Sequence, residues 1–219
     1  MYRLAIFDLD GTLVDSLEDL AASYNEVLTA MGCPVYPVES YRQFVGNGLI
    51  RLAEDVLPAD RQSDADIKRF CDMFAEVYSR RYAENTRPYP GMTELIAKLS
   101  SGGVYTAVVS NKPHEFARRI VHEMFGDTFT EVCGKTDDMP KKPAPDLVLA
   151  IMERCGVQPD DAVMVGDSSV DIQTGQNAGI HTIGCTWGFR GRDELTAAGA
   201  EHLADTADDL YRIIMAHQR

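Results

Sequence analysis

Residues 4 to 13 read Leu4-Ala5-Ile6-Phe7-Asp8-Leu9-Asp10-Gly11-Thr12-Leu13, and the character of the stretch changes halfway. Its first four residues form an apolar run, which predicts a short strand buried on both faces. Side chains two residues apart on a strand point the same way, so Asp8 and Asp10 can face one site. Two like charges held that close need a cation or a proton to offset their repulsion. Gly11 lets the backbone turn and bring its amides to an anion. A plain strand that ends in an Asp-Gly turn is the alternative at this point.

The composition is that of a soluble globular protein. Hydrophobic residues make up 45% of the 219 residues and charged residues 25%, an ordinary balance, and the length suffices for one core plus a smaller domain. No apolar run approaches the ~18 residues that cross a bilayer. The apolar stretch before Asp8 is too short for a signal peptide. We therefore expect a cytoplasmic protein without a membrane partner.

Charge and cysteine usage exclude further classes. The net charge is −13, which argues against a nucleic-acid partner because phosphate backbones demand a basic face. Small anionic substrates remain compatible, since a metal ion and a few lysines can focus positive charge inside an acidic protein. The five cysteines are scattered and the five histidines dispersed. We expect reduced thiols rather than disulfides, and no zinc or histidine-rich metal site.

The chain from residue 14 to 85 has a helical pattern. Apolar spacing predicts a helix over residues 17–31, and Ser16 with Asp19 resembles a capping box at its start. No stretch in this block predicts a strand. Further helices are expected over residues 39–44, 49–56 and 67–82.

From residue 86 onward, strands alternate with helices. This alternation predicts a parallel sheet covered on both faces, with ligands at the carboxyl ends of its strands. We therefore expect an α/β core from residues 1–13 and 86–219, with a helical domain inserted over residues 14–85. Strands are predicted over residues 4–7, 104–109, 129–133, 162–165, 181–185 and 202–204. Helices are predicted over residues 93–99, 114–124, 146–155, 172–177, 194–198 and 208–216.

Two loops that follow the first part of this sheet carry groups suited to an anion. The strand over 104–109 ends in Ser110-Asn111-Lys112, where a hydroxyl and free amides suit a phosphate, although Ser110 can equally cap the next helix. The loop Lys141-Lys142-Pro143-Ala144-Pro145 is stiffened by its prolines, which would fix Lys142 as a point charge. A solvated lysine pair is the alternative.

The strand over 162–165 repeats the logic of the opening strand. It runs into Gly166-Asp167-Ser168-Ser169-Val170-Asp171. Asp167 lies at the strand tip and Asp171 one helical turn further, so both can face the same site. A capping role alone is the alternative for this pair.

Four motifs thus occur in order at strand ends: Asp8-x-Asp10-Gly-Thr, Ser110, Lys142-Pro-x-Pro and Gly166-Asp167-Ser-x-x-Asp171. Together they resemble the haloacid dehalogenase (HAD) superfamily of phosphatases and phosphotransferases, and the resemblance spans nearly the whole chain. It implies a HAD-like Rossmannoid, doubly wound parallel sheet with an inserted all-helical C1 cap. Within the superfamily the chain most resembles phosphoglycolate phosphatases, partly through Val45-Gly46-Asn47-Gly48.

The resemblance implies a role for each motif residue. Asp8 would be the nucleophile that forms an aspartyl-phosphate, and Asp10 would act as general acid and then as general base. Mg²⁺ suits such an oxygen-only site, with Asp8, the Asp10 carbonyl and Asp167 as ligands and Asp171 in or just behind the coordination sphere. Phosphate would be held by Thr12, Ser110, Asn111 and Lys142, with the amides of Leu9, Asp10 and Asn111 completing the cradle.

The helical insert is expected to supply substrate specificity. Gly46, Asn47 and Gly48 precede a helix and can present amides to a second anionic group, with Arg51 nearby. This suits a carboxylate-bearing substrate such as 2-phosphoglycolate, whereas a turn that merely needs glycine is the alternative. Lys112 is a further candidate contact to the distal end of the substrate.

Other functions stay open within this resemblance. A pyrophosphatase, a 5′-nucleotidase, a sugar phosphatase and β-phosphoglucomutase are alternatives, although residues 14–85 lack the histidine usual in such mutases. A catalytically silent binding protein is the alternative of a different class. The expected partner is a small phosphorylated metabolite, and the expected assembly is a monomer or a homodimer.

Overall fold

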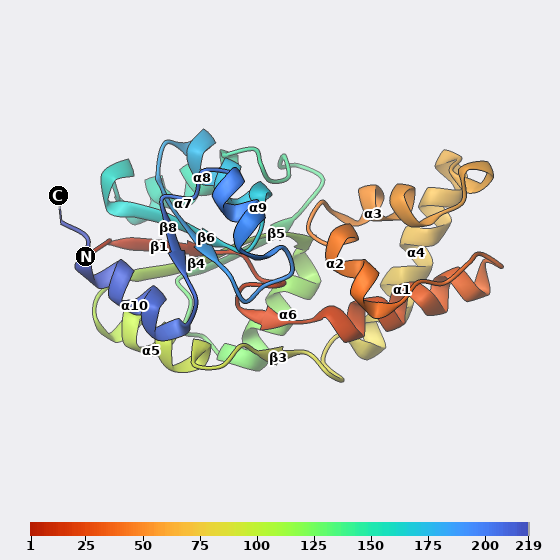
Figure 1. Cartoon of the computed structure of the whole chain (residues 1–219), viewed down its shortest axis with the longest axis horizontal. Coiled ribbons are helices and arrows are strands. Elements are labelled where there is room, and N and C mark those ends of the chain that lie inside the picture. Colours follow the sequence, from red (N-terminus) through yellow and green to blue (C-terminus); the bar gives the residue numbers. More distant parts are fainter. Residues whose placement is uncertain (219) are drawn as a thin grey trace. The chain divides into compact units, whose positions relative to one another are not determined.

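The computed structural model describes residues 1–218 and divides the chain into two compact units (Figure 1). One unit contains residues 1–15 and those from 88 onward, and the other contains Ser16–Arg87. Each crossing lies two residues after the boundary we predicted. Two-residue strands β2 (Val14–Asp15) and β3 (Arg87–Pro88) pair at these crossings. The expectation of no strand in residues 14–85 is therefore wrong at β2, which is too short to show the alternating pattern of a strand.

The first unit is built on a six-stranded sheet in the order β5-β4-β1-β6-β7-β8, and every pairing is parallel. This confirms the predicted doubly wound sheet. β4 continues past the predicted end at residue 109, through the Ser-Asn-Lys motif. The strands are β1 (Leu4–Phe7), β4 (Tyr105–Pro113), β5 (Glu131–Lys135), β6 (Ala162–Gly166), β7 (His181–Cys185) and β8 (His202–Ala204).

Helices cover both faces of this sheet (Figure 1). One layer comprises α5 (Met92–Ser101), α6 (His114–Phe125) and α10 (Ala207–Ala216). The other comprises α7 (Asp146–Cys155), α8 (Ser169–Ala178) and α9 (Gly191–Ala197). The sheet is therefore buried on both sides, as the near-continuous apolar strands require.

The central strand sets the position of the site. All four residues of β1 are buried, and its last residue, Phe7, pairs with Val108 of β4 and Val165 of β6. The chain winds outward from β1 in both directions, which makes the carboxyl end of β1 a topological switch point. The residues that follow β1, β4 and β6 are thereby brought together.

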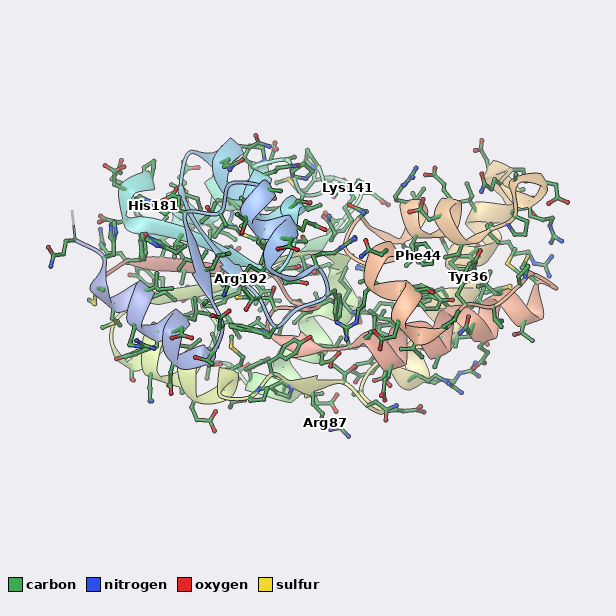
Figure 2. The ribbon with its side chains drawn as sticks, in the orientation of Figure 1. Tyr36, Phe44, Arg87, Lys141, His181 and Arg192 are labelled. Carbon is green, nitrogen blue, oxygen red and sulfur yellow. The ribbon has the colours of Figure 1, made fainter. Side chains whose placement is uncertain are left out.

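The second unit is helical around an aromatic core. Tyr24 stacks on Phe74 with ring centroids 4.4 Å apart, and Tyr36 meets Phe44 edge-on at 5.5 Å (Figure 2). Its α-helices are α1 (Leu17–Ala30), α2 (Tyr41–Phe44), α3 (Leu49–Val56) and α4 (Asp64–Arg81). Short 3₁₀ helices occupy Val38–Ser40 and Ala59–Arg61. No helix in residues 1–218 combines the length and the apolarity needed to cross a bilayer.

The predicted capping box at the start of α1 is wrong. The side chain of Ser16 bonds no amide of the helix it precedes. The buried carboxylate of Asp19 instead accepts hydrogen bonds from the backbone amides and side chains of Asn85 and Thr86, at 2.7–2.9 Å. These partners lie 66 and 67 residues away in sequence, so the local spacing could not reveal them. Asp19 ties the beginning of the insert to its end.

Candidate active site

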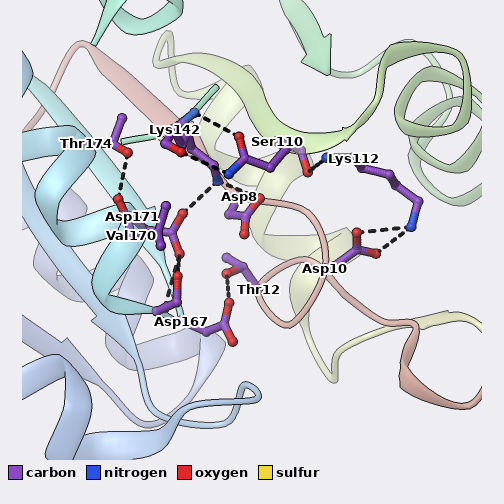
Figure 3. Close-up of polar contacts among 12 residues, drawn as sticks. Asp8, Asp10, Thr12, Ser110, Lys112, Lys142, Asp167, Val170, Asp171 and Thr174 are labelled. Carbon is purple, nitrogen blue, oxygen red and sulfur yellow. Dashed lines mark hydrogen bonds and ion pairs between the residues drawn. The ribbon is translucent and has the colours of Figure 1, made fainter. Parts of the chain in front are cut away.

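Three buried carboxylates converge at the carboxyl end of the sheet (Figure 3). Asp8 directly follows β1, Asp167 directly follows β6, and Asp171 lies in the first turn of α8. One carboxylate oxygen of each lies within 4.8 Å of the others. The fold brings these acids together from positions up to 163 residues apart in sequence. This convergence is the one expected at a topological switch point.

Lys142 lies inside this cluster. Its Nζ is 2.8 Å from Oδ1 of Asp8 and 2.7 Å from Oδ1 of Asp171. Burial disfavours the charged ammonium, but Asp171 and Asp8 outweigh that effect and raise the pKa of Lys142. The side chain therefore carries a fixed positive charge rather than the solvated charge of a loop lysine.

The backbone of Lys142 is held by Asn111. Oδ1 of Asn111 accepts a hydrogen bond from the Lys142 amide at 2.8 Å, and Nδ2 donates one to the Lys142 carbonyl at 3.1 Å. Both residues are buried. The side chain of Asn111, which we predicted to bind phosphate, thus connects the end of β4 to the lysine loop.

The charge balance at the cluster suits a divalent cation. When all three carboxylates are ionised, one ammonium leaves two negative charges uncompensated. Burial raises the pKa of Asp8 to about 7. It outweighs the nearby charge of Lys142, which lowers this pKa, and the charge on Asp171 adds to the rise. Burial, together with the charges on Asp171 and Asp8, also raises the pKa of Asp167. A small hard cation with oxygen ligands fits these residues, and its charge would relieve the repulsion among them.

Asp171 serves two purposes at once. Its Oδ1 is the partner of Lys142, while Oδ2 accepts hydrogen bonds from the amide of Ser168 at 3.1 Å and from its hydroxyl at 2.7 Å. The capping role that we considered as an alternative is therefore real, and it orients the carboxylate toward the site. A Cβ at Gly166 would lie 2.2 Å from Cβ of Asp171, so only glycine fits there.

Asp167 is oriented from both sides. Oδ1 accepts a hydrogen bond from the Thr12 hydroxyl at 3.2 Å, and Oδ2 accepts one from the amide of Phe189 at 2.7 Å. The hydroxyl of Thr12, which we predicted to bind phosphate, is therefore directed at a carboxylate.

The loop after β7 was missed in the sequence. Trp187 donates from Nε1 to the carbonyl of Thr12 at 3.1 Å. A Cβ at Gly188 would lie 2.2 Å from Cβ of Asp167 and 2.4 Å from the carbonyl oxygen of Gly11. Trp187-Gly188-Phe189 therefore packs directly against two of the motifs. A Trp-Gly-Phe tripeptide carries no titratable group, so nothing in its residue types pointed to the site.

Asp10 stands apart from the other acids (Figure 3). Its two carboxylate oxygens lie 2.9 and 3.0 Å from Nζ of Lys112, and both side chains are largely buried. The amide of Lys112 donates to Oγ of Ser110 at 3.2 Å. The end of β4 thus supplies a hydroxyl and an ammonium to the same edge of the sheet.

The remaining predicted residues belong to the helical unit. Gly46 and Gly48 have φ of +112° and +88°, which favours glycine, and α3 begins directly after them. This geometry agrees with a turn that needs glycine. Arg51 is half exposed and lies 3.3 Å from Glu54 and 2.7 Å from Asp55. The role in substrate specificity that we assigned to this segment, Asn47 included, stays a prediction.

Comparison with known proteins places this site in a family. The model of the haloacid dehalogenase-like hydrolases matches residues 5–185. A phosphoglycolate phosphatase of Psychrobacter arcticus is 38% identical over 195 residues, covering 85% of this chain and 84% of that protein.

Solved structures agree. A protein of Lactobacillus delbrueckii subsp. bulgaricus, provisionally assigned as a phosphoglycolate phosphatase, is 31% identical with a TM-score of 0.91, covering 97% of this chain and 98% of that one. A single-site mutant of CbbY from Rhodobacter sphaeroides, in complex with xylulose 1,5-bisphosphate, is 25% identical with a TM-score of 0.81, covering 94% and 95%. The motifs, the sheet order and these similarities lead to one conclusion: the chain belongs to the haloacid dehalogenase-like hydrolase family and is an enzyme of the phosphatase type.

Proposed function

We propose that this protein is a Mg²⁺-dependent phosphomonoesterase that works through an aspartyl-phosphate on Asp8, with 2-phosphoglycolate or a similar small organic phosphate as its substrate. The observation that carries the proposal is the placement of Asp8. It lies at the tip of the central strand, 2.8 Å from the buried ammonium of Lys142 and beside two further carboxylates.

The reaction divides into two displacements at phosphorus. In the first, a carboxylate oxygen of Asp8 bonds to phosphorus, the bond to the ester oxygen breaks, and Asp10 gives its proton to the leaving alkoxide. In the second, a water molecule attacks the same phosphorus while Asp10 takes one of its protons. The bond to Asp8 then breaks, which releases phosphate and regenerates both carboxyl groups in their starting forms.

The other residues of the site manage charge. Lys142 offsets the negative charge around Asp8 and can donate hydrogen bonds to the phosphoryl oxygens of the substrate. Ser110 in β4 offers the same oxygens a hydroxyl. Mg²⁺ held by Asp8, Asp167 and the carbonyl of Asp10, with Asp171 beside them, would stabilise the charge that develops on the transferring phosphoryl group.

The substrate is argued from the relatives and from the helical unit. The curated relative quoted above is a phosphoglycolate phosphatase, and the segment Gly46–Gly48 with Arg51 offers amides and a cation to a substrate carboxylate. Sugar phosphates are the second candidate, since CbbY binds a sugar bisphosphate in its solved complex. Pyrophosphate and nucleoside monophosphates complete the set of substrates to compare.

The proposal is tested by phosphate release from a panel of these compounds together with p-nitrophenyl phosphate, in Mg²⁺ and in EDTA, with Asp8→Asn as the blank. We expect turnover that EDTA abolishes. A preference for 2-phosphoglycolate of about tenfold or more in kcat/KM, equivalent to ~1.4 kcal/mol of transition-state stabilisation, supports the substrate assignment. Equal turnover across the panel overturns that assignment alone, and no turnover of any compound overturns the enzymatic function.

A further inference from the structure

The ion pair between Lys112 and Asp10 does not follow from the proposed chemistry. Lys112 is 4% exposed and Asp10 11% exposed at the side chain, and Nζ reaches both carboxylate oxygens, at 2.9 and 3.0 Å. The two residues are 102 positions apart in sequence: Lys112 lies in β4, and Asp10 lies in the loop after the neighbouring strand β1. A buried pair of this kind needs good geometry to offset the desolvation of both charges, so its presence beside the site calls for a reason.

The surroundings of Asp10 supply that reason. The carboxylates of Asp8, Asp167 and Asp171 lie close enough to share one cation. Asp10 follows Asp8 by two residues in the loop after β1, yet its carboxylate is directed to Lys112 (Figure 3). A carboxylate that joined the cation site would be lost to proton transfer.

We propose that Lys112 is a positioning residue, which holds the carboxylate of Asp10 away from the three clustered carboxylates and keeps it oriented for proton transfer. This inference rests on the proposed function of Asp10 as general acid and base. It gives Lys112 a role distinct from the contact to the distal end of the substrate that the sequence suggested.

The ammonium of Lys112 reaches both carboxylate oxygens of Asp10. Because Nζ of Lys112 lies within hydrogen-bond distance of both oxygens, one oxygen can carry the transferred proton while the other keeps its hydrogen bond to the ammonium. The orientation of the carboxyl group is therefore maintained when the proton leaves for the alkoxide and when another arrives from water. General catalysis depends on this kind of fixed placement, because the donor must lie within hydrogen-bond reach of the reacting oxygen.

Lys112 is itself held in place by the fold. It lies within β4, its amide donates to Oγ of Ser110, and the next residue but one begins α6. Ser110 and Lys112 lie two residues apart in the part of β4 where the pairing with β5 is irregular. This segment of β4 thus supplies both the anchor of the proposed acid–base residue and the Ser110 hydroxyl that accepts from the amide of that anchor.

The test is a double-mutant cycle in kcat with Lys112→Met and Asp10→Asn, measured on 2-phosphoglycolate and on glycerol 2-phosphate, which lacks a carboxylate. We expect Lys112→Met to lower kcat at least about tenfold for both substrates, within the range of general acid–base catalysis, with KM unchanged within about twofold. In the Asp10→Asn background we expect no further loss, because Lys112 acts only through Asp10. Lys112→Arg should recover part of the activity.

A second measurement separates the two displacements. The nitrophenolate ion leaves without a proton, so a burst of nitrophenolate from p-nitrophenyl phosphate should persist in Lys112→Met while the steady-state rate falls. The matched control is Lys68→Met, which removes an exposed lysine 2.6 Å from Asp72 on α4 and should change neither rate.

Each contrary result has a distinct meaning. A rise in KM for 2-phosphoglycolate alone, additive with Asp10→Asn, overturns the positioning role in favour of a substrate contact. An equal loss of burst and steady-state rates, with a lowered unfolding midpoint, also overturns it, because the pair would then be only structural. If the unmodified protein turns over the panel and Lys112→Met has the same kcat, the inference alone fails. If the unmodified protein turns over nothing, the proposed function fails as well.

Discussion

Replacing Lys142 by methionine tests how the buried charges at the candidate site are balanced. Lys142 is 3% exposed, and its Nζ lies within 2.8 Å of a carboxylate oxygen on both Asp8 and Asp171. Methionine retains most of the volume but removes the ammonium that contacts both acids. Taking away one partner of a buried ion pair costs ~3–5 kcal/mol, because the other partner is left uncompensated.

We therefore expect Lys142→Met to lower the free energy of unfolding by about 3–5 kcal/mol, a large fraction of the total stability of a domain. The assay is urea denaturation at pH 7.5 in EDTA, followed by circular dichroism. Lys141→Met is the matched control, because Lys141 is the adjacent lysine and is exposed, and it should change the free energy by less than about 0.5 kcal/mol. Mg²⁺ should restore part of the loss in Lys142→Met. A loss below about 1 kcal/mol, the value of an exposed salt bridge, would refute the reasoning.

Three further changes follow from the contacts described above. Gly188→Ala should lower kcat by more than tenfold and weaken Mg²⁺ binding in calorimetry, because its Cβ would lie 2.2 Å from Asp167; unchanged binding would show that the loop can move aside. Asp19→Ala should lower the free energy of unfolding by about 3 kcal/mol, since it removes the acceptor of the buried Thr86 donors and of the Asn85 amide. A change within 0.5 kcal/mol, about that of a surface substitution, would contradict this role of Asp19. In EDTA the thermal midpoint should fall as pH rises toward 8. The pKa of Asp8 is raised from 3.8 to about 7 in the folded protein, so its contribution is present below pH 3.8 and is lost as pH passes 7. Mg²⁺ should make the fall of the thermal midpoint smaller. A thermal midpoint that rises as pH increases toward 8 would exclude a raised pKa for Asp8.

The sequence predicted the sheet because its strands are buried on both faces. Apolar runs such as Leu4–Phe7 and Ala162–Gly166 are bounded by glycine or carboxylates, so both their extent and their carboxyl ends are visible in the residue types. The convergence of Asp8 and Asp167 then followed from the geometry of parallel strands, whereas the position of Lys142 rested on its stiffened loop and on the family resemblance. β4 was harder, because it extends through the polar Ser110–Lys112 segment, which resembles a loop.

The features that were missed depend on contacts between distant parts of the chain. Asp19 and Ser16 have the spacing of a capping box, but a buried carboxylate takes the strongest donors within reach, and these are Asn85 and Thr86. The pairing of Lys112 with Asp10 and the packing of Gly188 against Asp167 leave no local pattern either. Side-chain partners across a sheet become visible only once the strand order is known.

Trapping the covalent bond between Asp8 and phosphorus tests the proposed reaction most directly. The protein is mixed with ³²P-labelled 2-phosphoglycolate and Mg²⁺, quenched in acid within the first turnover, and digested for peptide mapping. We expect acid-stable, hydroxylamine-labile label on the peptide that contains Asp8, formed and lost at rates compatible with kcat and absent from Asp8→Asn. Turnover without any protein-bound label, or label on a peptide that lacks Asp8, would contradict it.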